Sequence, residues 1–69
     1  MEAANVNALR KLDEEEGHYA VVWVPWLGSE LLNAARDRDW KVVAISETAG
    51  CEVVFERRFA VARHQLPPL

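Results

Sequence analysis

The segment from Trp40 to Phe59 constrains the fold more than any other part of this 69-residue chain. It reads WKVVAISETAGCEVVFERRF and contains two runs that are rich in β-branched and aromatic residues. Such residues favour strands. Residues 47–50, which separate the two runs, are a loop with a glycine at its end. The segment therefore predicts a β-hairpin.

Two further elements precede the hairpin. Residues 18–24, HYAVVWV, predict a strand that ends at Pro25, and because both of its faces are apolar we expect both to be covered. Residues 29–39, SELLNAARDRD, predict a helix with Ser29 as its N-cap. A strand, a helix and a second strand in one sheet require the two strands to run parallel. With the hairpin partner antiparallel, the sheet is predicted to be mixed.

The N-terminal segment completes the predicted fold. Val6, Leu9 and Leu12 recur at helical spacing and indicate an amphipathic helix, which Gly17 is expected to end. The predicted fold class is α+β, with an N-terminal helix followed by a βαββ unit whose small three-stranded mixed sheet packs on helix. One domain is expected. It divides into an N-terminal helix (1–17), a βαββ core (18–62) and an extended tail (63–69).

Alternation along the strands predicts which side chains are buried. In the hairpin, the faces expected to be apolar carry Trp40, Val42 and Ala44 on one strand, and Cys51, Val53, Phe55 and Phe59 on the other. Arg57 falls on the apolar side and is expected to mark a bulge or the exit of the strand from the core. Trp23 is also expected in the core, whereas Trp26, in a turn between Pro25 and Leu27, is the tryptophan hardest to bury.

Size and composition limit the alternatives. A domain this short buries only about 60% of its unfolded surface, and 51% hydrophobic residues is too apolar for a disordered chain. A second copy or a larger partner could supply additional burial. The single cysteine excludes an internal disulfide and favours a reduced, cytoplasmic protein. No signal peptide is expected, and the longest apolar run, residues 19–24, is too short to cross a membrane.

No constellation of residues predicts an enzyme. His18 and His64 lie at opposite ends of the domain, Ser29 lacks a nucleophile-elbow context, and the three glycines fit turns or caps. Cys51 has no adjacent cationic cluster and is interpreted as a buried or half-buried structural thiol. We therefore expect no catalytic residues, no cofactor and no metal site.

Charge disfavours nucleic acid as the partner. The formal net charge is −3, whereas phosphate neutralisation dominates the affinity of non-specific nucleic-acid binders. Arg57 and Arg58 lie near Phe55 and Phe59 and could form a basic-aromatic surface. Alternation separates Arg58 from both phenylalanines, and neighbouring glutamates offset the charge. Direct nucleic-acid binding through this strand therefore stays an alternative.

The stretch from Tyr19 to Phe59 resembles the small bacterial DUF4177-type domain. The resemblance rests on Tyr19-Ala-Val-Val, Leu31-Leu32, Trp40-Lys-Val-Val and Val54-Phe55-Glu56-Arg57-Arg58. It implies a βαββ unit and brings no known catalytic residue set. That family usually has glycine directly before the tryptophan as a helix C-cap, whereas this chain has Asp39, a residue type that tolerates the left-handed conformation.

These observations predict a non-enzymatic protein-interaction module that acts by occupying a partner's surface. The expected contact residues are Trp26, because an exposed tryptophan beside proline is a frequent binding anchor, and the acidic run Glu14, Glu15 and Glu16. An alternative is an acidic inhibitor encoded by a phage or mobile element, similar in size and charge to anti-CRISPR proteins. Such an inhibitor would imitate phosphates and block a defence or nucleic-acid-processing complex. A homodimer is a further alternative.

Overall fold

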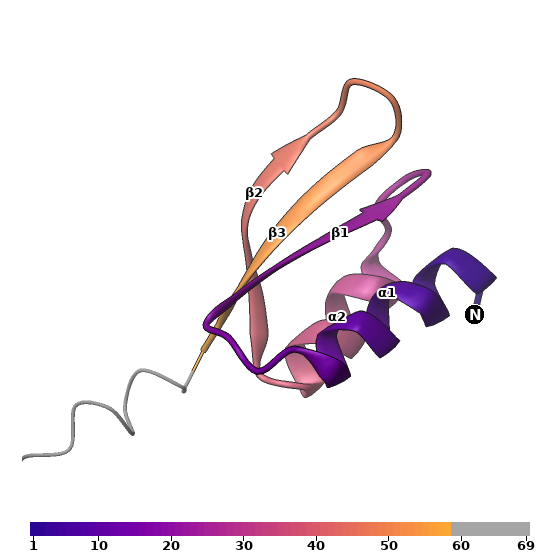
Figure 1. Cartoon of the computed structure of the whole chain (residues 1–69). Coiled ribbons are helices and arrows are strands. Elements are labelled where there is room, and N and C mark those ends of the chain that lie inside the picture. Colours follow the sequence, from indigo (N-terminus) through magenta and orange to yellow (C-terminus); the bar gives the residue numbers. More distant parts are fainter. Residues whose placement is uncertain (59–69) are drawn as a thin grey trace, which may run out of the picture.

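The computed structural model describes residues 1–58 and confirms the α+β fold class. Two helices and three strands follow one another along the chain: α1 (Ala3–Glu14), β1 (Tyr19–Val24), α2 (Ser29–Asp37), β2 (Trp40–Ser46) and β3 (Cys51–Arg57) (Figure 1). The predictions made for Phe59, His64, the end of the core at residue 62 and the tail of residues 63–69 lie outside the described residues.

The three strands form one sheet in the order β1-β3-β2. β1 and β2 run in the same direction, as the helical connection requires, but β3 lies between them and is antiparallel to both. The prediction of a mixed sheet is therefore wrong, because no two neighbouring strands are parallel. Placing β3 in the centre lets this strand hydrogen-bond along both of its edges. It also buries Val53 and Phe55 completely.

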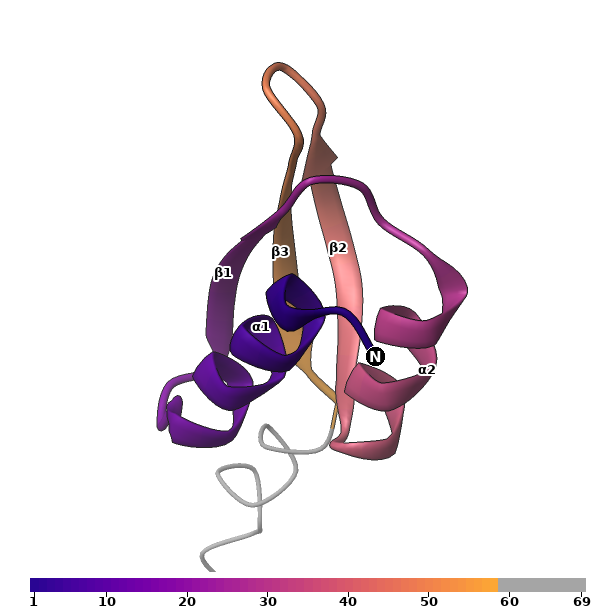
Figure 2. The same cartoon turned by 90° about the vertical axis from the view of Figure 1, so that its right-hand side faces the viewer.

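Both helices cover the same face of the sheet (Figures 1 and 2). α1 packs against β1, α2 packs against β2, and the two helices also contact each other. The core between the layers takes residues from every element: Ala8, Leu9, Leu12, Ala20, Val22, Val24, Leu31, Ala35, Trp40, Cys51, Val53 and Phe55. The predicted burial of Trp40, Cys51 and the alternating apolar residues of β3 is confirmed.

Within residues 1–58 nothing covers the opposite face of the sheet, which contradicts the prediction that β1 is covered on both sides. Tyr19, Val21 and Trp23 are exposed on this face, while the residues between them are buried. Trp23, predicted to be in the core, is 56% exposed. The reason is that α1 packs beside α2 on one face of the sheet, so no element within residues 1–58 is left for the other face.

A bulge in β2 changes which residues face the helices. Val42 pairs with Phe55 but Ala44 pairs with Val54, so Val43 is an extra residue between the two pairs. Cross-strand partners share a face of the sheet. Ala44 therefore lies on the open face together with Val54, and the prediction that it shares a face with Val42 is wrong. A bulge inserts one residue and so inverts the alternation beyond it.

The helix ends differ from the prediction by small shifts. α1 ends at Glu14 with Glu15 as its C-cap, and Gly17 does not adopt the left-handed conformation. α2 has Gly28 as its N-cap; Ser29 is the first helical residue and makes no capping hydrogen bond. Glu30 lies in the first turn of α2, where an anion is favourable.

Arg57 fastens the end of α1 to the sheet. Its Nη2 donates a hydrogen bond to the carbonyl oxygen of Glu15 at 2.6 Å, and its Nε donates to the carbonyl oxygen of Gly17 at 3.1 Å. The guanidinium also lies over the Trp40 ring, 4.1 Å from its centroid. Carbonyls near a helix C-terminus lack intrahelical partners. Arg57 therefore satisfies carbonyl groups just beyond α1, and it lies where β3 leaves the core.

Asp39 takes the left-handed conformation, with φ of 65°, between α2 and β2. This conformation costs a non-glycine residue about 1–2 kcal/mol. Asp39→Gly is therefore expected to raise the free energy of unfolding by about 0.5–1 kcal/mol, after the larger entropy of glycine in the unfolded chain is subtracted. Urea unfolding followed by circular dichroism measures the change. Asn33→Gly, at an exposed position in the middle of α2, is the control and should destabilise; a loss of stability in Asp39→Gly would contradict the strain argument.

Candidate interaction surface

The uncovered face of the sheet, called the open face below, is built from three rows of residues that run across the strands. Each row contains one residue from β1, one from β3 and one from β2, set by the strand register. The rows are Tyr19, Glu56 and Lys41; Val21, Val54 and Ala44; and Trp23, Glu52 and Ser46. The open face therefore has an apolar middle row between two rows that carry polar groups.

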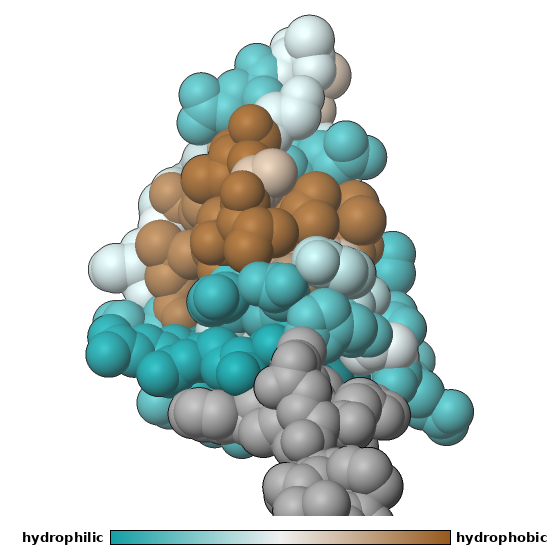
Figure 3. Space-filling view, turned by 90° about the vertical axis from the view of Figure 1, so that its left-hand side faces the viewer, coloured by the Kyte–Doolittle hydropathy of each residue, from teal (hydrophilic) through white to brown (hydrophobic). Residues whose placement is uncertain are grey.

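Apolar groups gather at the middle of the open face (Figure 3). Val21 is 41% exposed and Val43, the extra residue of the bulge, is 46% exposed. Tyr19 and Trp23 flank Val21 along β1 and are also more than half exposed. In Figure 3 the brown apolar area lies between teal hydrophilic areas above and below it. A contiguous exposed apolar area with a polar rim is typical of an interaction site.

Glu56 is the centre of the polar row. Its Oε2 accepts hydrogen bonds from the Tyr19 hydroxyl at 3.0 Å and from His18 Nε2 at 3.1 Å. Lys41 Nζ lies 3.4 Å from its Oε1. The hydrogen bond from Tyr19 is the main reason why the pKa of Glu56 is lowered, with His18 and Lys41 adding to the effect. The same hydrogen bond raises the pKa of Tyr19.

The lowered pKa of Glu56 predicts a dependence of stability on acid. Folding favours the ionised carboxylate, so its contribution is present above the ordinary pKa of 4.5 and is lost as the pH falls below that value through the folded-state pKa. Glu56→Gln should lose stability relative to wild type at pH 7, and the difference should shrink as the pH is lowered. Urea unfolding from pH 7 to pH 3 measures it.

Glu52→Gln is the matched control because it lies on the same strand and leaves the Tyr19–Glu56 hydrogen bond in place. A constant difference between Glu56→Gln and wild type at every pH would show that the Glu56 contacts add no ionisation-linked stability.

Trp23 is exposed but held in place. Its Nε1 donates a hydrogen bond of 2.7 Å to the carbonyl oxygen of Ala49, in the loop between β2 and β3. The indole lies directly against Gly50, where an added Cβ would be 2.4 Å from the ring. Gly50 also has a φ of +87°, a conformation that other residues rarely adopt. The β2–β3 loop therefore fixes the orientation of an exposed tryptophan. Aromatic residues with fixed orientation are effective binding anchors.

The predicted contact residues lie apart from one another. Trp26 is 59% exposed, as expected, and its ring lies against Gly28. Glu14 and Glu16 are also exposed, at the C-terminal end of α1. β1 leads from that end of the molecule to the turn that contains Trp26 (Figure 1). A strand of six residues spans roughly 20 Å. The structure therefore does not join Trp26 and the acidic run into one site.

Glu15 has a structural role within the acidic run. It is only partly exposed, its Oε2 accepts a hydrogen bond from the amide of Gly17 at 3.0 Å, and its carbonyl accepts the bond from Arg57. Substitution of Glu15 would therefore change the helix end as well as the surface charge. Glu14 and Glu16 are the better residues for testing the acidic run as a contact.

Trp23, Tyr19 and Val21 are surface residues that sequence reasoning assigned to a covered strand. Their pattern in the sequence is that of any strand buried on both sides, since Tyr19 through Val24 are all apolar or aromatic. Only the position of α1 distinguishes the two faces. Sequence alternation therefore carried no signal for the open face.

In the described part of the chain, the other singled-out groups are not gathered into a metal site. Cys51 is buried, as predicted, and His18 is partly exposed and bonded to Glu56. Within residues 1–58, no three His, Cys, Asp or Glu side chains are grouped so that they could hold a metal ion. Neither helix in this described part of the chain has the length and apolar character needed to span a membrane.

Comparisons with known proteins assign no family to the chain, so a proposal about its role depends on the geometry of the open face. A scan against protein-family models, a search of curated proteins and a search of solved structures found no match to the chain.

Proposed function

We propose that this chain is a non-enzymatic protein-interaction module that binds a partner protein through the open face of its sheet. The observation that carries the proposal is the apolar middle row with the bulge residue Val43, exposed beside two oriented aromatic side chains, Tyr19 and Trp23. Covering these residues would complete the sheet's second layer, and burial of apolar surface contributes about 25 cal/mol per Å².

The chemistry of the open face suits a protein better than a nucleic acid. Interface cores are apolar and enriched in tyrosine and tryptophan, with polar groups at the rim. Glu52 and Glu56 lie on the open face and would repel phosphates. Arg57, one of the two arginines of the basic-aromatic alternative, is engaged with the end of α1 and with Trp40. That alternative therefore has only part of the basic surface it requires.

The proposal predicts that a charge on the middle row abolishes binding. Immobilised wild-type chain is incubated with lysate of the source cell at low and moderate salt, and bound proteins are quantified by mass spectrometry. Val21→Glu is expected to reduce the amount of a stoichiometric partner at least tenfold, because a charge would be desolvated in the interface. Circular dichroism checks that the variant is folded.

Val6→Glu is the matched control. Val6 lies on α1 and is 42% exposed, whereas Val21 on the open face is 41% exposed. The two variants therefore introduce the same charge at positions of equal exposure, and only Val21→Glu should release the partner. Retention of the partner by Val21→Glu, or recovery of nothing except nucleic acid, would overturn the proposed function. If only further copies of the chain itself are recovered, and Val21→Glu abolishes their recovery, the partner is a second copy.

A further inference from the structure

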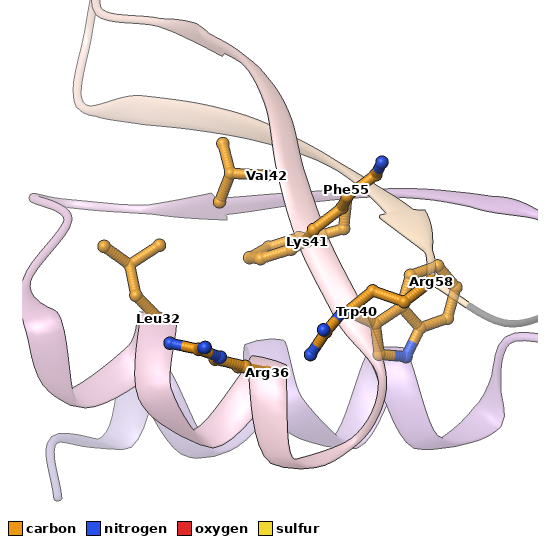
Figure 4. A pocket seen from close by; sticks show the side chains of 7 residues that line it. All are labelled: Leu32, Arg36, Trp40, Lys41, Val42, Phe55 and Arg58. Carbon is orange, nitrogen blue, oxygen red and sulfur yellow. The ribbon is translucent and has the colours of Figure 1, made fainter.

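A second surface lies along the outer edge of β2, the edge that does not pair with β3. It is a groove between this strand and α2. The groove contains a pocket of about 370 Å³. Leu32 of α2, Val42 of β2 and Phe55 of β3 give it an apolar wall, and Trp40 also lines it (Figure 4). Trp40 and Phe55 are almost completely buried, so the pocket exposes only small parts of them.

Positive charge is concentrated around this pocket. Arg36 on α2, Lys41 on β2 and Arg58 after β3 all line it. Figure 4 shows Arg36 on α2 and Arg58 beyond the end of β3, with the Arg58 side chain extending toward α2. Arg36 makes no ion pair within residues 1–58. Three cationic residues at one opening are unexpected in a chain with a net charge of −3, and they favour an anionic ligand.

The backbone beside the pocket is also available. β2 lies at the edge of the sheet, and no strand within residues 1–58 pairs with its outer side. An unpaired edge offers backbone donors and acceptors to an extended segment of another chain. Recognition of peptides by strand addition combines these backbone hydrogen bonds with pockets that receive alternate side chains. The groove therefore has both of the parts that such recognition requires.

We propose that the groove between α2 and β2 binds an extended acidic segment of a partner protein. The segment adds to the outer edge of β2 and places an apolar side chain in the pocket against Leu32 and Val42. Its carboxylates, two residues away on the same face of the segment, pair with Arg36 and Arg58. Guanidinium groups bind carboxylates in bidentate geometry. This site meets the open face at Lys41, which pairs with Glu56 there, but it uses the edge of β2 and α2 and goes beyond the proposed function.

The apolar wall and the strand edge distinguish an acidic peptide from a polyphosphate or nucleic acid. A phosphate backbone would use the three cationic groups and would leave Leu32, Val42 and the edge of β2 without a partner. An acidic peptide whose apolar and acidic side chains share one face of the added strand uses all of these features at once. Its affinity should therefore depend on the apolar side chains as well as on the charge.

The test uses the full chain and two fluorescein-labelled hexapeptides. The acidic probe is Thr-Asp-Thr-Leu-Thr-Glu, whose Asp, Leu and Glu side chains share one face of an extended strand, and the neutral probe replaces its Asp and Glu by Asn and Gln. Fluorescence anisotropy should show the acidic probe binding at least tenfold more tightly than the neutral one. Arg36→Gln combined with Arg58→Gln should weaken the acidic probe at least tenfold, whereas Arg10→Gln, an exposed substitution on α1, should leave it unchanged.

Chemical-shift mapping places the probe and separates this proposal from the proposed function. Shifts are expected along β2 and on the side of α2 that carries Leu32 and Arg36, and Val21→Glu should not alter probe binding. Three outcomes would each overturn the groove proposal. They are equal affinity for the two peptides, shifts confined to Val21 and Val54, and displacement of the labelled probe by a hexathymidylate as effectively as by the unlabelled acidic peptide. Shifts at Val21 and Val54 would place the probe on the open face, whereas the other two outcomes do not bear on binding there.

Discussion

Phe55→Ala is expected to lower the free energy of unfolding by about 3–5 kcal/mol. Phe55 is completely buried in the central strand, where it pairs with Ala20 on one side and Val42 on the other. Removing the ring leaves a cavity between the sheet and the helices. A domain of this size has little stability in reserve. We therefore expect most of the variant to be unfolded at 37 °C, which thermal unfolding followed by circular dichroism measures.

Trp26→Ala is the control because it removes a larger aromatic side chain from an exposed position. Trp26 is 59% exposed, and its truncation should change the free energy of unfolding by less than about 1 kcal/mol. A loss from Trp26→Ala as large as that from Phe55→Ala would place Trp26 in the core and would contradict the assignment of the two residues.

The burial of Phe55 was accessible from the sequence because apolar residues alternate along β3. Cys51, Val53 and Phe55 are apolar, Glu52 and Glu56 occupy the other face, and between Cys51 and Glu56 only Val54 departs from the alternation. The hairpin loop and the two helices were predicted for similar local reasons. Each of these features depends on residues that are close together in the sequence.

The strand order and the open face depend on contacts between distant parts of the chain. β3 could pair with either edge of β2, and the local sequence pattern does not distinguish the two edges. The sequence does not predict the bulge at Val43 either. β2 is apolar at five of its seven positions, so apolar residues occupy both of its faces with or without the bulge. These two features decide which apolar residues are exposed. The sequence therefore predicted an interaction protein but did not predict which face of the sheet is open.

The candidate contact residues illustrate the same limit. Exposure of Trp26 follows from its turn, which is local, and is confirmed. Trp23 is more informative, because its exposure depends on the packing of α1 and its orientation depends on the loop that contains Gly50. The distance between Trp26 and Glu16 depends on the direction of β1 relative to α1. None of these is encoded within a short window of sequence.

Arg57 shows how a residue that breaks a pattern can have a structural role. It interrupts the apolar alternation of β3, and its position at the end of the strand lets its side chain reach the carbonyl groups of Glu15 and Gly17. The partners lie 42 and 40 positions away in the sequence, so no spacing rule identifies them. The irregularity was visible in the sequence, and its cause was not.

Arg57→Met is expected to lower the free energy of unfolding by about 2–3 kcal/mol. A hydrogen bond from a charged donor contributes about 1.5–3 kcal/mol, and exposure to solvent reduces the contribution of each of the two bonds here. Loss of the interaction with the Trp40 ring adds about 0.5–1 kcal/mol. Methionine retains part of the apolar stem over Trp40. The change in free energy therefore reports mainly the contribution of the guanidinium group. Urea unfolding gives its magnitude.

Hydrogen exchange distinguishes this role from a general loss of packing. Arg57 holds the C-terminal end of α1. In Arg57→Met, the free energy of opening should therefore fall more for amides in the last turn of α1 than for amides of β3. Arg57→Lys should recover part of the stability, since an ammonium can donate to one carbonyl but cannot reproduce the planar fork. Arg10→Met, which removes an exposed arginine from α1 itself, is the matched control and should change stability by less than about 0.5 kcal/mol. Equal protection at the end of α1 in wild type and Arg57→Met would show that the helix is held by Leu9 and Leu12 alone.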